Sequence, residues 1–152
     1  MKPITINQVF IKLFALIALC FTAFSFTAKL GLDSYEIYLN NKLILKQSVN
    51  QPLNLRVLQL DHAKDKDQLR IRYKHCTLEG AGTNRSIVLK DEKGNILKKW
   101  GFADATGADL SMTISVKELL QLQQDHAQHE LSISYTAREL PKGETLALLR
   151  LK

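Results

Sequence analysis

The sequence predicts an all-β fold: an antiparallel two-sheet β-sandwich with immunoglobulin-like architecture. Three observations support this prediction. Beyond residue 31 the apolar residues recur with a period of two, about eight or nine such segments are separated by turn residues, and only one short segment near 116–124 has a helical pattern. A closed barrel is the alternative. The Cys and Trp signature of true immunoglobulin domains is missing, so the prediction concerns architecture and not that family.

The N-terminal segment differs from the rest of the chain. Residues 9–26 are mostly apolar with Lys12 as their only charge, and Lys2 precedes them. A basic start, an apolar run and then small residues are typical of a secretory signal peptide, and Ala23 and Ser25 suit cleavage after Ser25. An uncleaved anchor is the alternative, since about 18 apolar residues can cross a membrane.

We therefore expect residues 1–25 to be a signal peptide and residues 26–152 to form a single domain with no membrane span after cleavage. A mature chain of about 125 residues is long enough for one core and too short for two. The hydrophobic fraction of 45% and the charged fraction of 24% are ordinary for a folded domain. The predicted location is periplasmic or extracellular.

Charge and cysteine content narrow the class further. Cleavage would remove two positive charges and no acid, which lowers the formal net charge from +6 to +4. The remaining Lys and Arg are dispersed along the sequence and not interleaved with aromatic residues, so we expect no nucleic-acid partner. Cys76 would be the single cysteine left, which excludes an intramolecular disulfide.

The first predicted strands lie in residues 35–46, a hairpin around Asn40, because asparagine tolerates the positive φ of a tight turn. Residues 51–60 are predicted as a strand whose apolar alternation shifts near its last residues, where a bulge or a strand end is expected. Its expected faces are Leu53, Leu55 and Val57 on one side, and Asn54 and Arg56 on the other.

A charged loop at 61–68 leads to a strand at 69–75, which places Leu69, Ile71 and Tyr73 opposite Arg70, Arg72 and Lys74. Residues 86–102 are predicted as a hairpin whose turn, 91–95, contains the glycine that a bulged turn needs.

The C-terminal part continues the β pattern around one helix. A strand at 109–116 leads into a helix through about Gln124, for which Ser115 and Glu118 have the spacing of a capping box. Strands at 130–140 and 144–152 close the domain.

The pair His75–Cys76 suggests a thiol nucleophile with a neighbouring base. On a strand, however, adjacent side chains point to opposite faces, so we expect His75 and Cys76 to face apart. Three cations on the Cys76 face would lower the pKa of a thiol, which keeps a redox role open. The glycines of residues 79–85 lack the spacing and the following helix of a phosphate loop.

His126 and His129 have the H-x-x-H spacing of a metal-binding pair, but two histidines need a third ligand to form a site. No motif indicates catalysis, and the sequence predicts no cofactor. Trp100, the one tryptophan, follows Lys98 and Lys99, and its strand would place Ile96, Lys98, Trp100 and Phe102 on one face. Core packing is the first interpretation of Trp100, and contact with a sugar ring or a partner protein is the second.

Three segments carry a resemblance: GLDSYEIYLNNKLILKQSVNQPLNLRVLQL (31–60), RSIVLKDEKGNILKKWGF (85–102) and ARELPKGETLALLRLK (137–152). Together they resemble small exported proteins of unknown function from Bacteroidetes, which implies a location in the cell envelope and no particular activity. We expect an exported, non-enzymatic binding module for a protein or polysaccharide of the envelope. Its candidate binding residues are Trp100, Lys98, Lys99 and Cys76. The alternative is a metal-binding or redox accessory protein that uses Cys76 or the His126/His129 pair.

Overall fold

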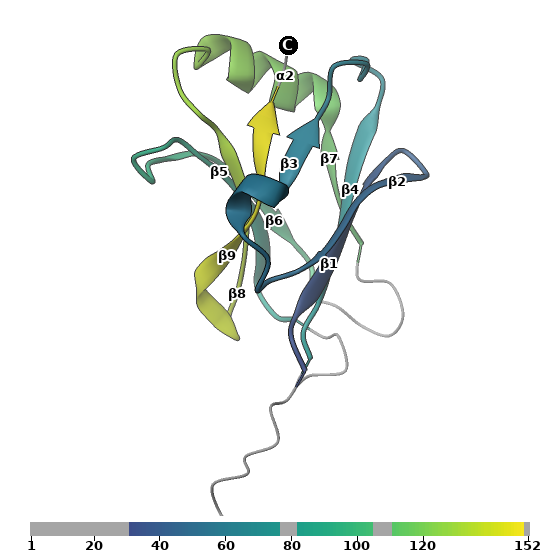
Figure 1. The fold of residues 1–152 in the computed structure, drawn as a ribbon, viewed down its shortest axis with the longest axis vertical. Coiled ribbons are helices and arrows are strands. Elements are labelled where there is room, and N and C mark those ends of the chain that lie inside the picture. The colour runs from purple at the N-terminus through teal and green to yellow at the C-terminus, as the bar shows by residue number, and fades with distance from the viewer. Residues whose placement is uncertain (1–30, 77–81, 105–110, 151–152) are drawn as a thin grey trace, which may run out of the picture. The chain divides into compact units, whose positions relative to one another are not determined.

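The computed structural model describes residues 31–76, 82–104 and 111–150, which form a sandwich of two β-sheets (Figure 1). Sheet A has the strand order β2-β1-β4-β7, and sheet B has the order β3-β9-β8-β5-β6. The predicted β-sandwich is thus confirmed, and the sheets do not close into a barrel. The expected signal peptide, 1–25, lies outside the described residues, as do residues 77–81 and 105–110.

Sheet A is antiparallel throughout and consists of β1 (Ser34–Leu39), β2 (Lys42–Ser48), β4 (Gln68–Lys74) and β7 (Ser111–Ser115). The β1–β2 hairpin turns at Asn40 with a φ of 54°, as the sequence predicts. In β4 the predicted alternation is confirmed, because its apolar side chains are buried between the sheets. The outer face of sheet A therefore carries the basic side chains of β4.

Sheet B consists of β3 (Val57–Gln59), β5 (Arg85–Lys90), β6 (Ile96–Phe102), β8 (Ser132–Ala137) and β9 (Leu140–Arg150). β3 and β9 pair in parallel, which departs from the antiparallel prediction. The β5–β6 turn contains Gly94 with a φ of 83°, and the side chain of Asp91 accepts the backbone N–H groups of Lys93 and Asn95. The predicted glycine turn is confirmed.

The prediction of one strand over 51–60 is wrong in both extent and facing. Leu53–Leu55 form a 3-10 helix, η1, and only β3 is extended. Leu55 is 60% exposed, whereas Arg56 is buried. The reason is a set of hydrogen bonds: the Arg56 Nη1 donates to Glu144 Oε1 at 2.8 Å and to the carbonyl oxygen of Thr145 at 2.6 Å. These partners on β9 compensate the guanidinium for the loss of water.

The predicted gap between two C-terminal strands is also absent. β9 begins at Leu140 and pairs with β8 from there on, with irregular register around residues 134–145. Gly143, with a φ of 74°, lies in this irregular part. A bulged strand replaces a loop because glycine allows the backbone to take a positive φ without leaving the sheet.

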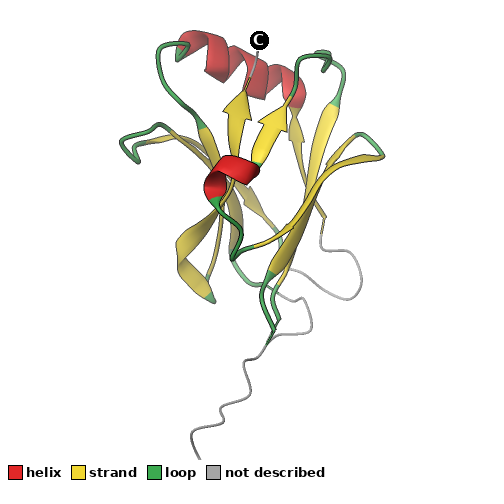
Figure 2. Ribbon diagram, viewed as in Figure 1, coloured by secondary structure: helices red, strands yellow, loops and turns green. Residues whose placement is uncertain are grey.

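Helix α2 (Val116–Asp125) lies across one end of the sandwich (Figure 2). Val116 and Leu119 are buried and attach the helix to the core. Ser115 is its N-cap, but the side chain makes no capping hydrogen bond, so the predicted capping box does not form. Glu118 is engaged by strand β6 instead.

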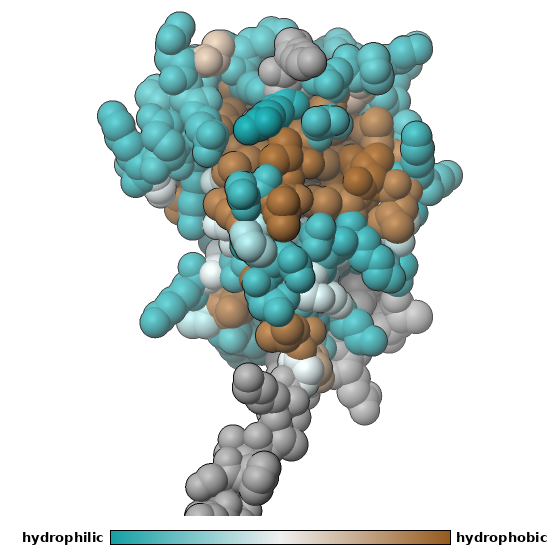
Figure 3. All heavy atoms as spheres, viewed as in Figure 1, coloured by the Kyte–Doolittle hydropathy of each residue, from teal (hydrophilic) through white to brown (hydrophobic). Residues whose placement is uncertain are grey.

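Apolar side chains reach the surface at one side of the sandwich. Figure 3 shows them gathered over η1 and β3 and toward β2. Leu43 of β2 is 44% exposed, and Leu55 of η1 is more exposed still. None of the helices in the described ranges is long and apolar enough to cross a membrane.

Candidate functional site

His75 and Cys76 face apart, as predicted, although β4 already ends at Lys74. The His75 ring is buried: its Nδ1 lies 3.2 Å from Asp33 Oδ2, and its Nε2 lies 3.1 Å from the hydroxyl of Tyr135. The Cys76 thiol is exposed and unpaired, and the backbone N–H of Cys76 donates to Asp33 Oδ1 at 2.8 Å. The imidazole is therefore turned away from the thiol, and the pair does not have the geometry of a nucleophile with its base.

Asp33, His75 and Tyr135 form a chain of polar groups between the sheets. The hydroxyl of Tyr73 also donates to Asp33, at 2.9 Å, and the rings of Tyr73 and Tyr135 stack with centroids 4.1 Å apart. Burial raises the pKa of Tyr135 to about 12 and raises the pKa of Tyr73 as well. We call these four residues the buried network. Because its members satisfy one another and its rings are covered, its evident role is to hold β1, β4 and β8 together.

Trp100 and Lys98 converge on one carboxylate of helix α2. The indole Nε1 of Trp100 donates to Glu118 Oε2 at 2.8 Å, and the Lys98 ammonium lies 2.6 Å from Oε1 of the same side chain. These bonds lower the pKa of Glu118, the one from Lys98 most. Trp100 is half-buried and packs against the core. Both side chains thus connect β6 to α2, and ligand binding through either stays a prediction.

The expected common face of β6 is only partly correct. The register shifts between Leu89 and Lys90, so that Lys98 lies opposite Leu89 while Ile96 lies opposite Lys90. This irregularity turns Ile96 to the outer face of sheet B, where it is 61% exposed. Ile96 thereby joins Lys99, and not Trp100.

Lys99 lies in a depression on the outer face of sheet B, with a volume of about 360 Å³. We call it the basic depression. Its lining residues come from β5, β6, β8, β9 and the segments that adjoin them: Asn84, Val88, Lys90, Ile96, Lys99, Thr136, Ala137, Arg138, Pro141 and Lys142. Four of these residues are cations and none is an acid.

Sheet register brings the four cations together. Val88 lies opposite Lys99 on one side and Ser134 on the other, and its buried side chain is part of the depression's lining. Within the ranges that the structure describes, no acid pairs with any of the four cations. Unpaired like charges around one depression create a positive potential that attracts anions.

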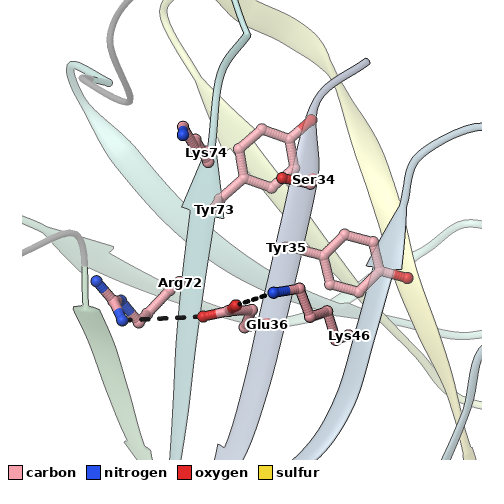
Figure 4. A pocket seen from close by; sticks show the side chains of 7 residues that line it. All are labelled: Ser34, Tyr35, Glu36, Lys46, Arg72, Tyr73 and Lys74. Carbon is pink, nitrogen blue, oxygen red and sulfur yellow. Dashed lines mark ion pairs between the residues drawn. The ribbon is translucent and has the colours of Figure 1, made fainter. Parts of the chain in front are cut away.

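The outer face of sheet A is also basic, but its charges are partly offset. A depression of about 340 Å³ lies on this face. In it Glu36 lies between Lys46, at 2.9 Å, and Arg72, at 3.8 Å, as the dashed ion pairs of Figure 4 mark. The hydroxyl of Tyr38 donates to Glu36 at 2.7 Å, and this bond and the one from Lys46 lower the pKa of Glu36. Glu36 thus neutralises the centre of this depression.

The histidine pair is not assembled as a metal site in the described part of the chain. The rings of His126 and His129 have centroids 6.3 Å apart, and His129 Nδ1 lies 2.8 Å from Glu92 Oε1. Among the residues that the structure describes, no three His, Cys, Asp or Glu side chains gather closely enough to hold a metal ion. The Glu92 contact instead connects the β5–β6 turn to the segment after α2.

Sequence inspection identified Lys99 and missed the other members of the basic depression. Lys90, Arg138 and Lys142 are separated by up to about fifty positions and match no motif, so only the strand register could have revealed them. Asp33 and Tyr135 escaped notice for the same reason. In comparisons with known proteins, the chain matches no family model, no curated protein and no solved structure.

Proposed function

We propose that this protein is an exported, non-enzymatic binding module whose basic depression takes an acidic segment of a partner protein in the cell envelope. One observation carries the proposal: four cations line one depression on the outer face of sheet B, without an acid among the lining residues. Export rests on the signal peptide expected at residues 1–25 and on the resemblance to small exported proteins from Bacteroidetes.

The lining chemistry favours a peptide over a polysaccharide. Sugar-binding sites commonly offer an aromatic ring for stacking, and no aromatic residue lines the basic depression. Ile96 and Pro141, both exposed, instead supply apolar surface in the same lining. A segment that alternates acidic and apolar side chains matches both features.

The expected affinity is modest and depends on salt. An exposed ion pair contributes roughly 0.2–1 kcal/mol, so four such contacts give about 1–4 kcal/mol before apolar contacts are added. Screening shortens the reach of these charges to about 8 Å at physiological ionic strength. By themselves these contacts correspond to a Kd of about 1 mM or weaker, so tighter binding requires the apolar contacts, and binding weakens as salt rises.

The test uses the full chain and a fluorescein-labelled ten-residue peptide of alternating Glu and Val. A triple variant, Lys99→Glu, Arg138→Glu and Lys142→Glu, reverses three exposed charges of the basic depression. The matched control reverses Lys64, Lys66 and Lys117, which are exposed and lie outside the depression. Fluorescence anisotropy at 50 mM salt should show at least tenfold weaker binding for the first variant and less than threefold for the control.

Equal losses in both variants would mean that net charge alone causes the binding, and the proposal would then be wrong. A second arm replaces the peptide with polygalacturonate. Tighter binding per carboxylate to this polymer, lost in the first variant only, would assign the depression to an acidic polysaccharide and overturn the choice of a protein partner.

A further inference from the structure

We infer that the outer face of sheet A carries a second anion site, centred on Arg70, which takes a carboxylate. The inference shares its ligand class with the proposed function and rests on different residues. It would give the sandwich one acid-binding face on each side of its core. Each face would then take a carboxylate of its own, so that two short acidic peptides are held at once.

The strand register determines the surroundings of Arg70. Arg70 lies on β4, opposite Tyr38 of β1 on one side and Thr113 of β7 on the other. Its guanidinium carbon lies 4.9 Å from the centroid of the Tyr38 ring. Contact with an aromatic face holds a guanidinium in place, so Arg70 loses little conformational freedom when an anion binds.

Arg70 has no partner for its hydrogen-bond donors in the part of the chain that the structure describes. Its Nε is buried and without an acceptor, and no acid forms an ion pair with it. The nearest acid along β1, Glu36, is already engaged by Lys46, Arg72 and Tyr38. Buried donors without an acceptor are rare and costly. Because Nε itself is covered, a carboxylate would bond end-on to the two terminal nitrogens, and this charge-assisted pair would offset part of that cost.

The neighbours of Arg70 favour an anion. Arg72 lies two residues away on the same face of β4, and the next position on that face is Lys74. Thr113 is exposed beside Arg70 and offers a hydroxyl donor. These three cations, near one acid that is already engaged, leave the outer face of β4 positively charged. Among them, Arg70 is the one that an aromatic ring holds in place for bidentate contact with an anion.

The two anion sites lie on opposite sides of the molecule. Arg70 extends from the outer face of sheet A, and the basic depression occupies the outer face of sheet B, with the core between them. Sheets pack about 10 Å apart, so a peptide of a few residues cannot contact both sites. Short acidic peptides should therefore bind with a stoichiometry of two.

The experiment follows the side-chain Nε–Hε resonance of Arg70 in ¹⁵N-labelled full-length protein during titration with an acetylated, amidated Glu-Val-Glu-Val-Glu peptide. Calorimetry of the same titration gives the stoichiometry. We expect a saturable shift of the Arg70 resonance and a stoichiometry of two. Arg70→Lys keeps the charge and removes the planar fork, and should weaken binding at this site at least fivefold. Lys74→Gln removes one charge from the same face and should weaken it less than threefold.

Tyr38→Leu provides a second variant that leaves every charge in place. Loss of the aromatic support should weaken the Arg70 site about twofold to fivefold. An Arg70 resonance that does not move, or a stoichiometry of one with the depression alone occupied, would overturn the inference. Equal binding by Arg70→Lys and wild type would overturn it too, because the site would then be a general charge effect.

The outcomes also separate this inference from the proposed function. In the Lys99→Glu, Arg138→Glu and Lys142→Glu variant, the Arg70 shift should persist while the stoichiometry falls to one. A wild-type protein that binds the peptide only at Arg70 would refute the proposed function and leave the second site standing. Binding only at the depression would do the reverse.

Discussion

The buried network and the basic depression are both clusters of polar side chains, but they differ in their partners. In the buried network, Asp33 Oδ2 accepts from the Tyr73 hydroxyl and lies beside His75, and Asp33 Oδ1 accepts from the backbone N–H of Cys76. The cations of the basic depression have no acid partner in the parts of the chain that the structure covers. The first cluster is complete without a ligand, and the second is not.

This difference separates a role in folding from a role in binding. Removing a polar side chain leaves its buried hydrogen-bond partners unsatisfied, which lowers the free energy of unfolding. Removing an exposed and unpaired charge changes that free energy little. We therefore expect substitutions in the buried network to change stability without changing peptide binding. Substitutions in the basic depression should do the opposite.

The largest effect is expected from Asp33→Ala. The substitution leaves the Tyr73 hydroxyl and the buried His75 Nδ1 without their common partner, and it also removes the acceptor of the solvent-exposed Cys76 backbone N–H. A buried donor without an acceptor costs about 1–3 kcal/mol, so a loss of about 3 kcal/mol or more is expected in the free energy of unfolding by urea. The control, Asp65→Ala, removes an exposed acid and should change this free energy by less than about 0.5 kcal/mol.

Peptide binding by folded Asp33→Ala should match that of wild type within twofold. A variant that unfolds easily but loses its binding while still folded would link the two clusters, and the comparison above would fail.

The second effect appears in alkali. Burial raises the pKa of Tyr135 from 10.0 to about 12, so folding favours the protonated phenol. The stabilisation is complete below pH 10 and is lost as the pH rises through about 12. Two pH units correspond to about 2.7 kcal/mol. Urea unfolding at pH 9, 10, 11 and 12 should show this decline, and Tyr135→Phe should flatten it by a comparable amount.

Every other titratable side chain is present in both proteins, so the difference between the two curves reports Tyr135 together with its effect on the stacked Tyr73. Parallel curves would show that the Tyr135 hydroxyl is not buried as the structure has it.

A smaller effect is expected at Glu118, whose partners are fixed but whose side chain is 38% exposed. Its pKa in the folded protein is lowered, first by Lys98 and then by Trp100. The stabilisation is therefore present above the unfolded pKa and disappears as the pH falls through the folded one. Because solvent screens the ion pair, Glu118→Gln should lower the free energy of unfolding by less than about 1 kcal/mol at pH 7, and should leave it unchanged in strong acid.

Trp100 fluorescence provides the measurement, since the indole bonds to Glu118 directly. A loss that stays constant down to pH 2 would show that the carboxylate charge contributes nothing and that the amide merely packs less well.

The sequence predicted the two-sheet architecture because it depends on local periodicity. The alternation of Leu69, Ile71 and Tyr73 is visible in the letters, and so is the opposed facing of His75 and Cys76. Arg56 and Leu55 were assigned to the wrong faces because the facing of Arg56 depends on Glu144, a partner 88 residues away. Periodicity contains no information about such a partner.

The candidate site was largely beyond prediction for the same physical reason. Lys90, Lys99, Arg138 and Lys142 come to line one depression because β5, β6, β8 and β9, on or beside which they lie, are neighbours in sheet B. The irregularity at Leu89 and Lys90 decides that Ile96 faces outward with them. Dispersed charge in the sequence therefore did not mean dispersed charge on the surface.

The smallest effect on stability is expected in the basic depression itself. Lys99→Gln, Arg138→Gln and Lys142→Gln together remove three charges that have no acid partner in the described part of the chain and that repel one another. Exposed substitutions of this kind usually stay within about 0.5 kcal/mol each, and relief of repulsion gives the change a stabilising sign. Thermal unfolding in 20 mM salt, compared with Lys64→Gln, Lys66→Gln and Lys117→Gln, measures it. The depression variant should melt at the same temperature as the control or higher, and 0.3 M salt should remove the difference. A fall of more than about 2 kcal/mol in the free energy of unfolding would instead give these cations a structural role like that of Asp33. The difference in partners between the buried network and the basic depression would then not distinguish a role in folding from a role in binding.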